Sequence, residues 1–555
     1  MDTPSKAPAR GRDSETEPLL RDTERNNGVP RHAAPTRQIG VVTAVFMIFN
    51  RMIGTGVFAT PSTILGFSGS VGLALVMWVI GALFALCGMQ VYIIWGTALP
   101  HNGGEKNYLE HLFPKPPRLI SSIYAGNAVL LAYAAGNALV FAEYSLASLS
   151  SVHPGPSSNV FSPVRIVAFL CLTSVILLHG LHIQSGLRLQ NALGFLKVGI
   201  LLIVVTAGFI ALSGNLQEGV VRPGNFDGWE TIWEGSRTGG SVVSASLYNV
   251  IWSFVGYSNA NYALAEMKDP ARTLRIAGPL AITTVGLFYL LCNIAYFAAA
   301  SKEEITGSGR LVAALLFRNV WGAKTERVLN GFVALSALGN VLSVLFSQGR
   351  VNQELGKKQV LPFSDVWASD WPAKAPLAGL ALHWAICLFV IFTIPEGDAY
   401  NFVLNINSYP LAVINATISI GLLYLSLRNH PFFTRGEKSL ELPPSLSSTA
   451  SATPYDSHEN PVHTPDPDDR QSPTQSRFFT FARTISLIIP TTIFAAANLF
   501  LIVMPLTKPP PGVEPYKRLP YWTHAAGGWA IFALGALWWV YRERKMRNTR
   551  DGLVM

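Results

Sequence analysis

The chain has 555 residues, of which 50% are hydrophobic and only 14% are charged. A soluble domain averages about 25% charged residues, so this composition excludes an ordinary soluble protein. The net charge of +9 does not indicate nucleic-acid binding, because much of the positive charge lies in the terminal tails and in short loops between apolar blocks.

The apolar residues are grouped into blocks of about 20, the length that an α-helix needs to cross a bilayer. We count twelve blocks, and we expect an all-α membrane protein with twelve transmembrane helices. The blocks cover residues 39–66, 71–98, 119–149, 164–182, 187–213, 241–265, 276–300, 328–349, 377–395, 399–427, 481–506 and 521–541.

The distribution of Lys and Arg predicts the orientation of these helices. With the N-terminus in the cytosol, the outer turns at 67–70, 150–163 and 395–399 contain no Lys or Arg, as the positive-inside rule requires. The loop at 301–327 is an exception, because it places five basic residues on the predicted outer side.

Polar segments divide the chain into five parts. Residues 1–37 are polar, charged and Pro-containing, and we expect a disordered cytosolic N-terminus. The core of helices 1–10 covers 38–430, and a disordered, Pro/Ser-rich cytosolic insert covers 431–477. Helices 11 and 12 cover 478–541, and a basic cytosolic tail covers 542–555. The insert is either a regulatory linker or a loop without a function of its own.

The first block is interrupted near its centre by Gly54-Thr55-Gly56. Two glycines two positions apart weaken a helix where no water can solvate the freed backbone groups. Such a break is tolerated only where it is buried in protein or faces a cavity, and in transporters it faces the substrate.

A second break lies in the sixth block, where Gly256 is followed by the polar stretch 257–261. Five spans separate equivalent positions of the two breaks, and an odd number of spans inverts the second unit relative to the first. This arrangement is typical of inverted-repeat transporters, with the site at the interface of the repeats. A close-packing seam between helices is the alternative explanation for each break.

Three segments carry a resemblance to a known family. Helix 1 contains Phe49-Asn50-Arg51-Met52-Ile53-Gly54-Thr55-Gly56-Val57-Phe58-Ala59-Thr60-Pro61, helix 6 contains Val255-Gly256-Tyr257-Ser258-Asn259-Ala260-Asn261-Tyr262-Ala263-Leu264-Ala265-Glu266-Met267-Lys268-Asp269-Pro270, and Gln353-Glu354-Leu355-Gly356-Lys357-Lys358 follows helix 8. The chain resembles the amino acid–polyamine–organocation superfamily, within it the L-type amino acid transporters, and most closely the fungal methionine permeases. The resemblance covers residues 38–430 and 478–541. It implies a 5+5 inverted-repeat core with broken helices 1 and 6, two further helices, alternating access, and an α-amino acid bound between the breaks.

A zwitterionic substrate agrees with the chemistry of the two breaks. Free N–H groups and the half-helix dipole after Gly54 suit a carboxylate. Unpaired carbonyl groups near Ile53 and in the stretch 252–255 suit an ammonium, so no buried counter-charge is needed. The predicted substrate-binding residues are Ile53, Gly54, Thr55, Gly56, Val57, Trp252, Ser253, Val255, Gly256, Ser258 and Asn259.

Lys197 lies inside the fifth block, about 16 Å from its cytosolic end at 1.5 Å per residue. It either snorkels toward the cytosol or acts as a tethered cation. The resemblance favours the second alternative, because several sodium-independent relatives place a Lys here, where sodium-coupled relatives bind the ion. Lys197 would then bridge helix 5 to helices 1 and 8.

Five side chains besides Lys197 are candidates for gating or coupling. Arg51 either forms a gate by pairing with a carboxylate or a helix C-terminus, or snorkels toward the cytosol. Trp252 aligns with the aromatic residue that caps the substrate in L-type transporters, with core packing as the alternative. Tyr133 and Ser343 place polar atoms on helices 3 and 8, which interhelical hydrogen bonding explains equally well. Glu143 is a candidate proton carrier near the predicted outer surface.

The chain shows no nucleophile elbow, phosphate loop or HExxH motif, so we expect no enzyme, no cofactor and no metal site. The four cysteines lie inside apolar blocks, and the loop 150–163 has none. We therefore expect no disulfide-linked heavy chain of the kind that L-type exchangers use. The plasma membrane is the expected location, although Glu15-Thr16-Glu17-Pro18-Leu19-Leu20 resembles a sorting signal for endosomal or vacuolar membranes.

We therefore expect a sodium-independent, proton-coupled permease for neutral L-amino acids, with methionine-like substrates among the candidates. The alternatives are an obligate amino acid exchanger, a permease for amines or GABA, and a nutrient receptor that has lost transport. The expected partners are the amino acid, protons and the lipid bilayer, without nucleic acid.

Overall fold

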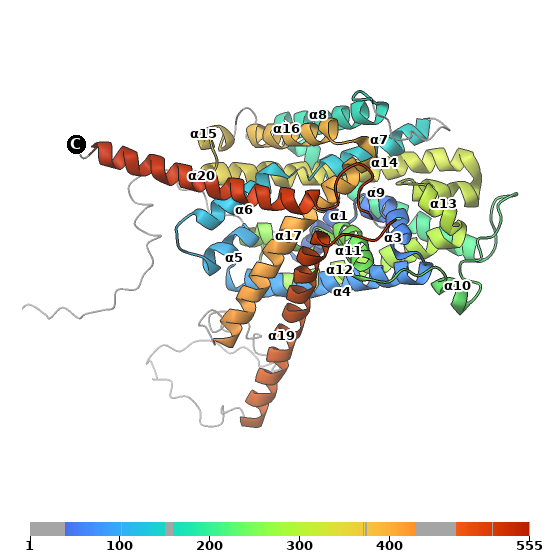
Figure 1. Ribbon diagram of the computed structural model, residues 1–555, viewed down its shortest axis with the longest axis horizontal. Helices are drawn as coiled ribbons and strands as arrows, with labels where there is room; N and C mark the ends of the chain where they lie inside the picture. The colour runs from blue at the N-terminus through green and yellow to red at the C-terminus, as the bar shows by residue number, and fades with distance from the viewer. Residues whose placement is uncertain are drawn as a thin grey trace, which may run out of the picture. The chain divides into compact units, whose positions relative to one another are not determined.

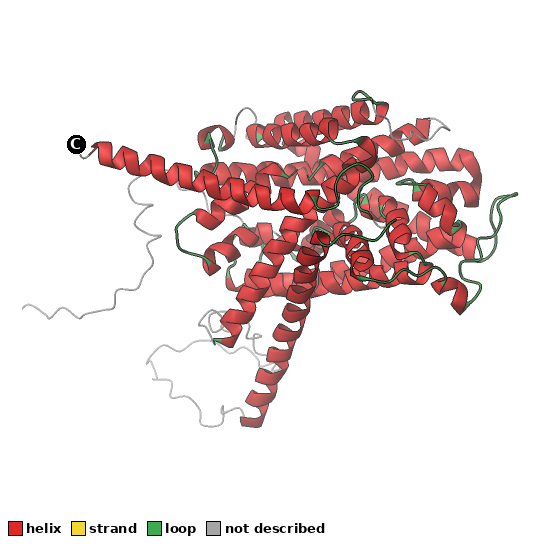
Figure 2. Cartoon of the chain, viewed as in Figure 1, coloured by secondary structure: helices red, strands yellow, loops and turns green. Residues whose placement is uncertain are grey.

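The computed structural model describes residues 39–428 and 473–553, apart from 102, 132, 150–158, 370, 372–374 and 513. These residues lie in the unit Gln38–Met555 (Figure 1). Over the described residues the chain forms helices and loops without a strand, and a single parallel bridge joins Ile39 to Met267 (Figure 2). The predicted N-terminal segment 1–37, the sorting motif within it, and most of the 431–477 insert lie outside the described residues.

The first half of the chain contains α1 (Val41–Met52), α2 (Gly56–Ala59), α3 (Pro61–Ser68), α4 (Val71–Ala98), α5 (Glu105–Leu112), α6 (Leu119–Leu130), α7 (Ala135–Leu149), α8 (Pro163–Leu181), α9 (Ile183–Leu212), α10 (Trp229–Trp233), α11 (Gly240–Phe254) and the 3₁₀ helix η1 (Tyr257–Glu266). The second half contains α12 (Pro270–Ala299), α13 (Lys302–Gly307), α14 (Val312–Lys357), α15 (Ser364–Trp367), α16 (Leu377–Thr393), α17 (Glu396–Leu427), α19 (Pro473–Val503), the 3₁₀ helix η3 (Met504–Leu506) and α20 (Thr523–Leu553).

Nine segments of the described chain are long and apolar enough to cross a membrane. The other three predicted blocks also fall on helices, but α16 has only 17 residues, the sixth block is divided between α11 and η1, and the twelfth forms the first part of α20. An all-helical, multi-pass membrane protein is therefore confirmed, whereas twelve crossings and the inverted repeat stay predictions.

The predicted loop 301–327 is largely helical. It contains α13 and the first part of α14, which bends at Gly322 (φ 81°). Three of its five basic residues are paired with acidic groups, in the pairs Lys302–Glu234, Arg310–Glu143 and Arg318–Glu326. These ion pairs neutralise much of the positive charge that ran against the positive-inside rule.

Two predicted boundaries in the C-terminal part differ from the structure. Helix α19 begins at Pro473, inside the predicted insert, and α20 continues to Leu553 through the predicted tail. The extension of α20 has a simple cause, because Arg542, Glu543, Arg544, Lys545 and Met546 all have high helix propensity.

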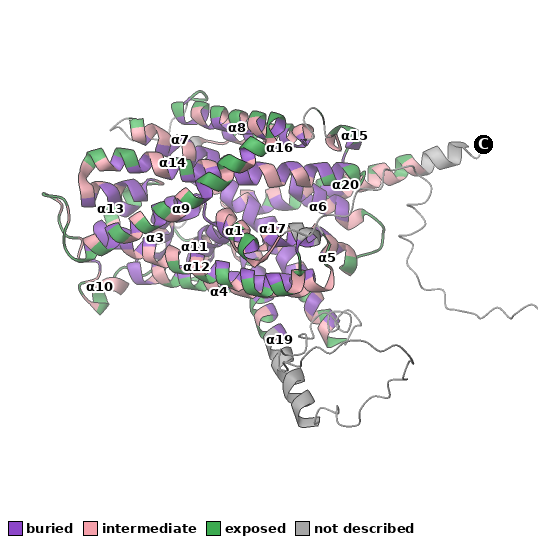
Figure 3. Ribbon diagram, turned by 180° about the vertical axis from the view of Figure 1, so that it is seen from behind, coloured by how far each residue is buried: buried purple, intermediate pink, exposed green. Residues whose placement is uncertain are grey.

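The core surrounds the two interrupted helices. Helix α1 packs against α12 and η1, α11 packs against α2, α3 and α4, and α14 packs against α7 and α9. Buried residues gather around α1, α11 and α17, whereas α8 and α20 carry many exposed residues (Figure 3). Exposed positions include large apolar side chains, as a surface in contact with lipid requires; examples are Leu83, Phe195, Leu202 and Phe209.

One carboxylate accepts three backbone hydrogen bonds from the loop 507–522, which connects η3 to α20. Asp398 in the first turn of α17 is buried and accepts hydrogen bonds from the backbone N–H groups of Lys517 (2.8 Å), Arg518 (2.8 Å) and Leu519 (3.2 Å). Following the predicted orientation, we call the end of the core with this loop and Glu143 the outer end, and the end with α5 the inner end.

Asp398→Asn is expected to destabilise the protein. An amide offers one acceptor oxygen in place of two and turns an NH₂ group toward backbone donors, and hydrogen bonds to charged groups contribute about 1.5–3 kcal/mol each. The thermal unfolding midpoint of the purified protein in detergent, followed by tryptophan fluorescence, measures this effect. The matched control is Asp227→Asn, because Asp227 forms only an exposed ion pair with Arg222. Equal midpoints for both variants would contradict the anchoring role of Asp398.

Candidate functional site

The two breaks lie directly against each other. A Cβ atom on Gly56 would lie 2.7 Å from the Ser253 Cα at the end of α11, and a Cβ atom on Gly256 would lie 2.5 Å from the Arg51 Cγ at the end of α1. Gly256 also has φ +122°, a conformation that side chains rarely adopt. Because each glycine lacks a side chain, the segment around it can approach the other break.

The first break leaves backbone N–H groups at the start of a short helix. Helix α1 ends at Met52, and α2 begins at Gly56 with Thr55 as its N-cap. The first bonds within the new turn run from the N–H groups of Phe58 and Ala59 to the Thr55 carbonyl, at 3.1 and 2.9 Å. The N–H groups of Gly56 and Val57 precede these bonds, so they have the geometry of unpaired helix N-terminal donors.

Lys197 is bound to the carbonyl end of α1. Its Nζ donates to the carbonyl oxygens of Ile53 (2.6 Å) and Asn50 (3.0 Å), and the side chain is 1% exposed. Its Cε lies against Gly339 of α14. The lysine thus lies between α9, α1 and α14 and does not snorkel. The Ile53 carbonyl, which we expected to be unpaired, already has a cationic donor.

The carbonyl groups of the second break are also largely engaged. The Tyr289 hydroxyl of α12 lies 2.7 Å from the Met52 carbonyl oxygen and 3.0 Å from that of Ser253, so one side chain reaches both breaks. The Trp252 carbonyl accepts the Val255 N–H at 3.1 Å. These contacts differ from the expectation of unpaired carbonyls at 252 and 253. Within the described residues, no hydrogen bond reaches the Val255 carbonyl.

The polar stretch after Gly256 is a 3₁₀ helix. Ser258 and Asn259 are half-buried in η1, and the Asn259 N–H donates to the Gly256 carbonyl at 3.0 Å. The low helix propensity of Ser and Asn is consistent with this irregular geometry. Both side chains therefore remain candidates for polar contacts at the second break.

An aromatic pair covers the breaks toward the outer end. Trp252 of α11 and Tyr400 of α17 both lie against Gly136 of α7. The Tyr400 hydroxyl is buried next to Thr55 and Trp252 without a hydrogen bond of normal geometry to either. The Thr55 hydroxyl instead donates to the Asn137 side chain at 2.9 Å. Trp252 is half-buried. A side chain that packs against helices on one side and faces a site on the other would have this exposure.

An ion pair lies beyond this aromatic pair. The Arg310 Nε donates to the Glu143 carboxylate at 2.7 Å, and the guanidinium lies 5.3 Å from the centre of the Tyr400 ring. The Glu143 side chain is 9% exposed and that of Arg310 is 20% exposed. Glu143 therefore has a cationic partner in Arg310.

Arg51 has an amide partner. Its Nη1 donates to the Asn340 Oδ1 at 3.4 Å, and the Asn340 Nδ2 donates back to the Arg51 carbonyl at 3.2 Å. None of the ion pairs found in the described part of the chain includes Arg51, so a carboxylate, one of the partners considered for it, is not found there. Ser343 lies one turn beyond Asn340 on α14, and the Tyr133 ring stacks on His383 at 6.4 Å.

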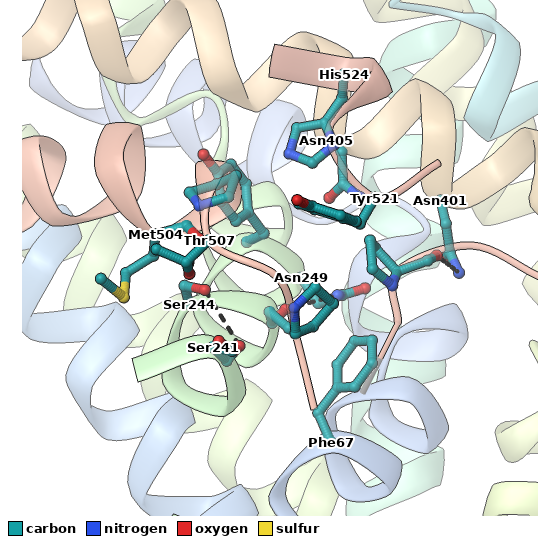
Figure 4. A pocket seen from close by; sticks show the side chains of 15 residues that line it. Phe67, Ser241, Ser244, Asn249, Asn401, Asn405, Met504, Thr507, Tyr521 and His524 are labelled. Carbon is teal, nitrogen blue, oxygen red and sulfur yellow. Dashed lines mark hydrogen bonds between the residues drawn. The ribbon is translucent and has the colours of Figure 1, made fainter. Parts of the chain in front are cut away.

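A cavity lies beside the outer half of α11 (Figure 4). Ser241, Ser244 and Asn249 line one side, and Tyr521, just before α20, and His524, in its first turn, line another. Asn249 is one turn from Ser253, whose hydroxyl donates to the Asn249 carbonyl at 3.0 Å. The cavity therefore begins next to the site and belongs to its outer surroundings.

The sequence reasoning did not identify Tyr289, Tyr400 and Arg310 as parts of the site. No motif marks them, because each acts through a contact with a distant element. The one available signal was a polar atom in an apolar block, which Tyr289 supplies.

Comparisons with known proteins agree with this architecture. A family model described as amino acid permease matches residues 39–532. The chain is 39% identical to the high-affinity methionine permease of Saccharomyces cerevisiae over 91% of this chain and 79% of that protein. It is 30% identical to the low-affinity methionine permease of the same organism, over 74% and 73% of the two chains. It is 25% identical to the mouse b(0,+)-type amino acid transporter 1, over 73% and 78%.

Gly56→Ala is expected to lower amino acid uptake about tenfold or more. The added methyl group would meet the backbone of Ser253, and overpacking costs about 1–3 kcal/mol. Radiolabelled uptake measures the effect, and size-exclusion chromatography checks folding. Gly199→Ala in α9 is the matched control, since a Cβ atom there meets nothing within 4 Å. Unchanged uptake by Gly56→Ala would remove this contact from the site.

Lys197→Met is expected to lower uptake by about tenfold or more in a protein that still folds. The change leaves two carbonyl groups at the break without their donor, and each unsatisfied group costs about 1–3 kcal/mol. Lys324→Met, at an exposed position of α14, is the control. Wild-type uptake by Lys197→Met would mean that the ammonium is dispensable.

Proposed function

This chain belongs to the amino acid permease family, and on that premise we propose that it is a secondary active transporter of neutral L-amino acids, including methionine. It is a multi-pass membrane transporter and not an enzyme. In our proposal transport is independent of sodium, coupled to protons, and proceeds by alternating access.

One observation carries this proposal: two glycine breaks meet at the centre of the helical core. Breaks in membrane helices expose backbone donors and acceptors where water is scarce, so they bind polar groups strongly. Here one break offers N–H groups, and the other offers a carbonyl group and two polar side chains. An α-amino acid has the complementary charges at a short, fixed separation.

We place the substrate carboxylate at the N–H groups of residues 54–57. The ammonium is placed at the Val255 carbonyl, with Ser258 and Asn259 beside it and Gly256 allowing the approach. The carbonyls of Ile53 and Ser253 can accept a second hydrogen bond, because a carbonyl oxygen has two lone pairs. Trp252 would cover the substrate side chain, and an unbranched, uncharged side chain such as that of methionine suits an aromatic cover.

The proposal of sodium independence rests on Lys197. Its ammonium occupies two carbonyl oxygens that a bound cation would otherwise use. A sodium ion beside it would meet like-charge repulsion in surroundings of low dielectric constant. The lysine therefore takes the structural place of an ion and holds α1 to α9 and α14.

For alternating access, we propose that the outer end closes through the Glu143–Arg310 pair and Tyr400. Arg51 with Asn340, together with Tyr133 and Ser343, would belong to the inward half of the pathway. We further propose a location in the plasma membrane and no disulfide-linked heavy chain. All four cysteines are unpaired within the described residues, and three of them are buried.

Uptake of labelled methionine in a permease-deficient host, with a panel of competitors, tests the function. We expect uptake that is raised by an inward proton gradient, unchanged when choline replaces sodium, and inhibited by other neutral amino acids. Flux only against internal amino acid would indicate an exchanger, and competition by amines or GABA would indicate an amine permease. Binding without flux would indicate a receptor.

A further inference from the structure

A buried carboxylate without a cationic partner lies at the inner end of the core. Glu105, the first residue of α5, is 2% exposed. Its two oxygens contact two phenol groups, Oε1 the Tyr92 hydroxyl at 2.7 Å and Oε2 the Tyr262 hydroxyl at 2.6 Å. None of the ion pairs of the described residues includes it. The neighbouring Lys106 pairs with Glu110 instead, at 2.6 Å.

The hydrogen count of this cluster leaves room for a proton on Glu105. The Tyr92 hydroxyl also lies 2.9 Å from the Asn415 Oδ1, which is an acceptor. A phenol carries one hydrogen and cannot donate to both Glu105 and Asn415. Both contacts become hydrogen bonds when Glu105 is protonated, because the carboxyl then donates to Tyr92 and Tyr92 donates to Asn415. Turning the Asn415 amide would satisfy the charged form, so the cluster accommodates both protonation states.

The cluster joins the second break to helices that lie far from it in the sequence. Tyr262 belongs to η1, which follows Gly256, whereas Tyr92 belongs to α4 and Asn415 to α17. The ring of Tyr262 also lies against Gly104, which precedes Glu105. Glu105 therefore holds the segment after the break against the inner end of the core.

The surroundings of Glu105 are mostly neutral phenols. Tyr124 of α6 interacts with both Glu105 and Tyr262. The other titratable or charged groups that interact with this cluster are Tyr108 of α5, Tyr133 between α6 and α7, Tyr257 of η1 and Arg51 of α1, while His111 of α5 lies against Trp95. Arg51 contacts Asn340, so the cation of the site is not bound to Glu105.

We propose that Glu105 is the group that takes up the coupling proton, and that its protonation loosens η1. This inference rests on the proposed transport function. A charged carboxylate accepts strong, charge-assisted hydrogen bonds from both phenols and holds η1 closed. Protonation forms one O–H bond, turns Oε1 into a donor toward Tyr92, and leaves Tyr262 with a weaker, neutral acceptor.

The cycle that follows balances in protons. The carboxylate receives one proton from the outside while substrate is bound, and η1 is released toward the inner side. Once the inner side is open, the proton leaves to the cytosol, and the charged carboxylate binds both phenols again. One proton enters with each substrate, without a redox step or another reactant.

Glu105→Gln tests the proposal, because glutamine fixes the neutral form and keeps a donor for Tyr92 and an acceptor for Tyr262. Purified wild type and variant are reconstituted in proteoliposomes, and methionine uptake is measured with and without an inward proton gradient. A pH-sensitive dye in the lumen reports proton entry. We expect the variant to exchange labelled methionine across the membrane, to show equal uptake with and without the gradient, and to lose substrate-induced acidification.

The matched control is Glu326→Gln, a second buried carboxylate that pairs with Arg318 at 2.7 Å; its gradient stimulation is expected to equal that of wild type. If Glu105→Gln does not fold, Tyr92→Phe keeps the carboxyl but removes the relay to Asn415, and is expected to reduce stimulation. Full gradient stimulation and acidification in either folded Glu105→Gln or Tyr92→Phe would overturn the assignment of Glu105. Wild-type flux without gradient dependence would overturn it too, while leaving the transport function standing. Absence of wild-type flux would overturn both.

Discussion

The close approach of the two helix breaks is the constraint on which the rest of the site depends. Gly56 faces the backbone of Ser253, and Gly256 faces the side chain of Arg51. A side chain at either glycine would separate the two helices, so the breaks are possible only as a pair. Because each helix stops where the other passes, both free their backbone groups at the same depth, and the neighbouring helices must satisfy those groups.

The hydrogen bonds that neighbouring helices make to these backbone groups determine which of the groups remain free to bind a ligand. Lys197 from α9 takes the carbonyl oxygens at the end of α1, and Tyr289 from α12 reaches a carbonyl of each break. The first break is thereby left with N–H donors and the second with an unengaged carbonyl at Val255. This division of donors and acceptors favours a zwitterion oriented in one direction, without a fixed charge in the substrate site.

The carboxylates at the two ends of the core have different partners. At the outer end Glu143 is bound to Arg310, and the pair rests on Tyr400, so its charge is compensated. At the inner end Glu105 is surrounded by tyrosine hydroxyls and has no cation among its described partners. In our proposals this difference in partners, more than the presence of a carboxylate, distinguishes the gate from the proton site.

The sequence by itself determined the helical membrane class, the positions of both breaks and the presence of Lys197 inside a span, because apolar block length, Gly spacing and a charge inside a span are local signals. It also led to the family through the segments around those breaks. Only the tertiary structure decided which carbonyls are engaged, since Lys197 and Tyr289 reach them from helices far along the chain. The roles of Tyr400, Arg310 and Glu105 were hidden for the same reason: each follows from a partner that packing, and not sequence distance, brings within a few ångströms.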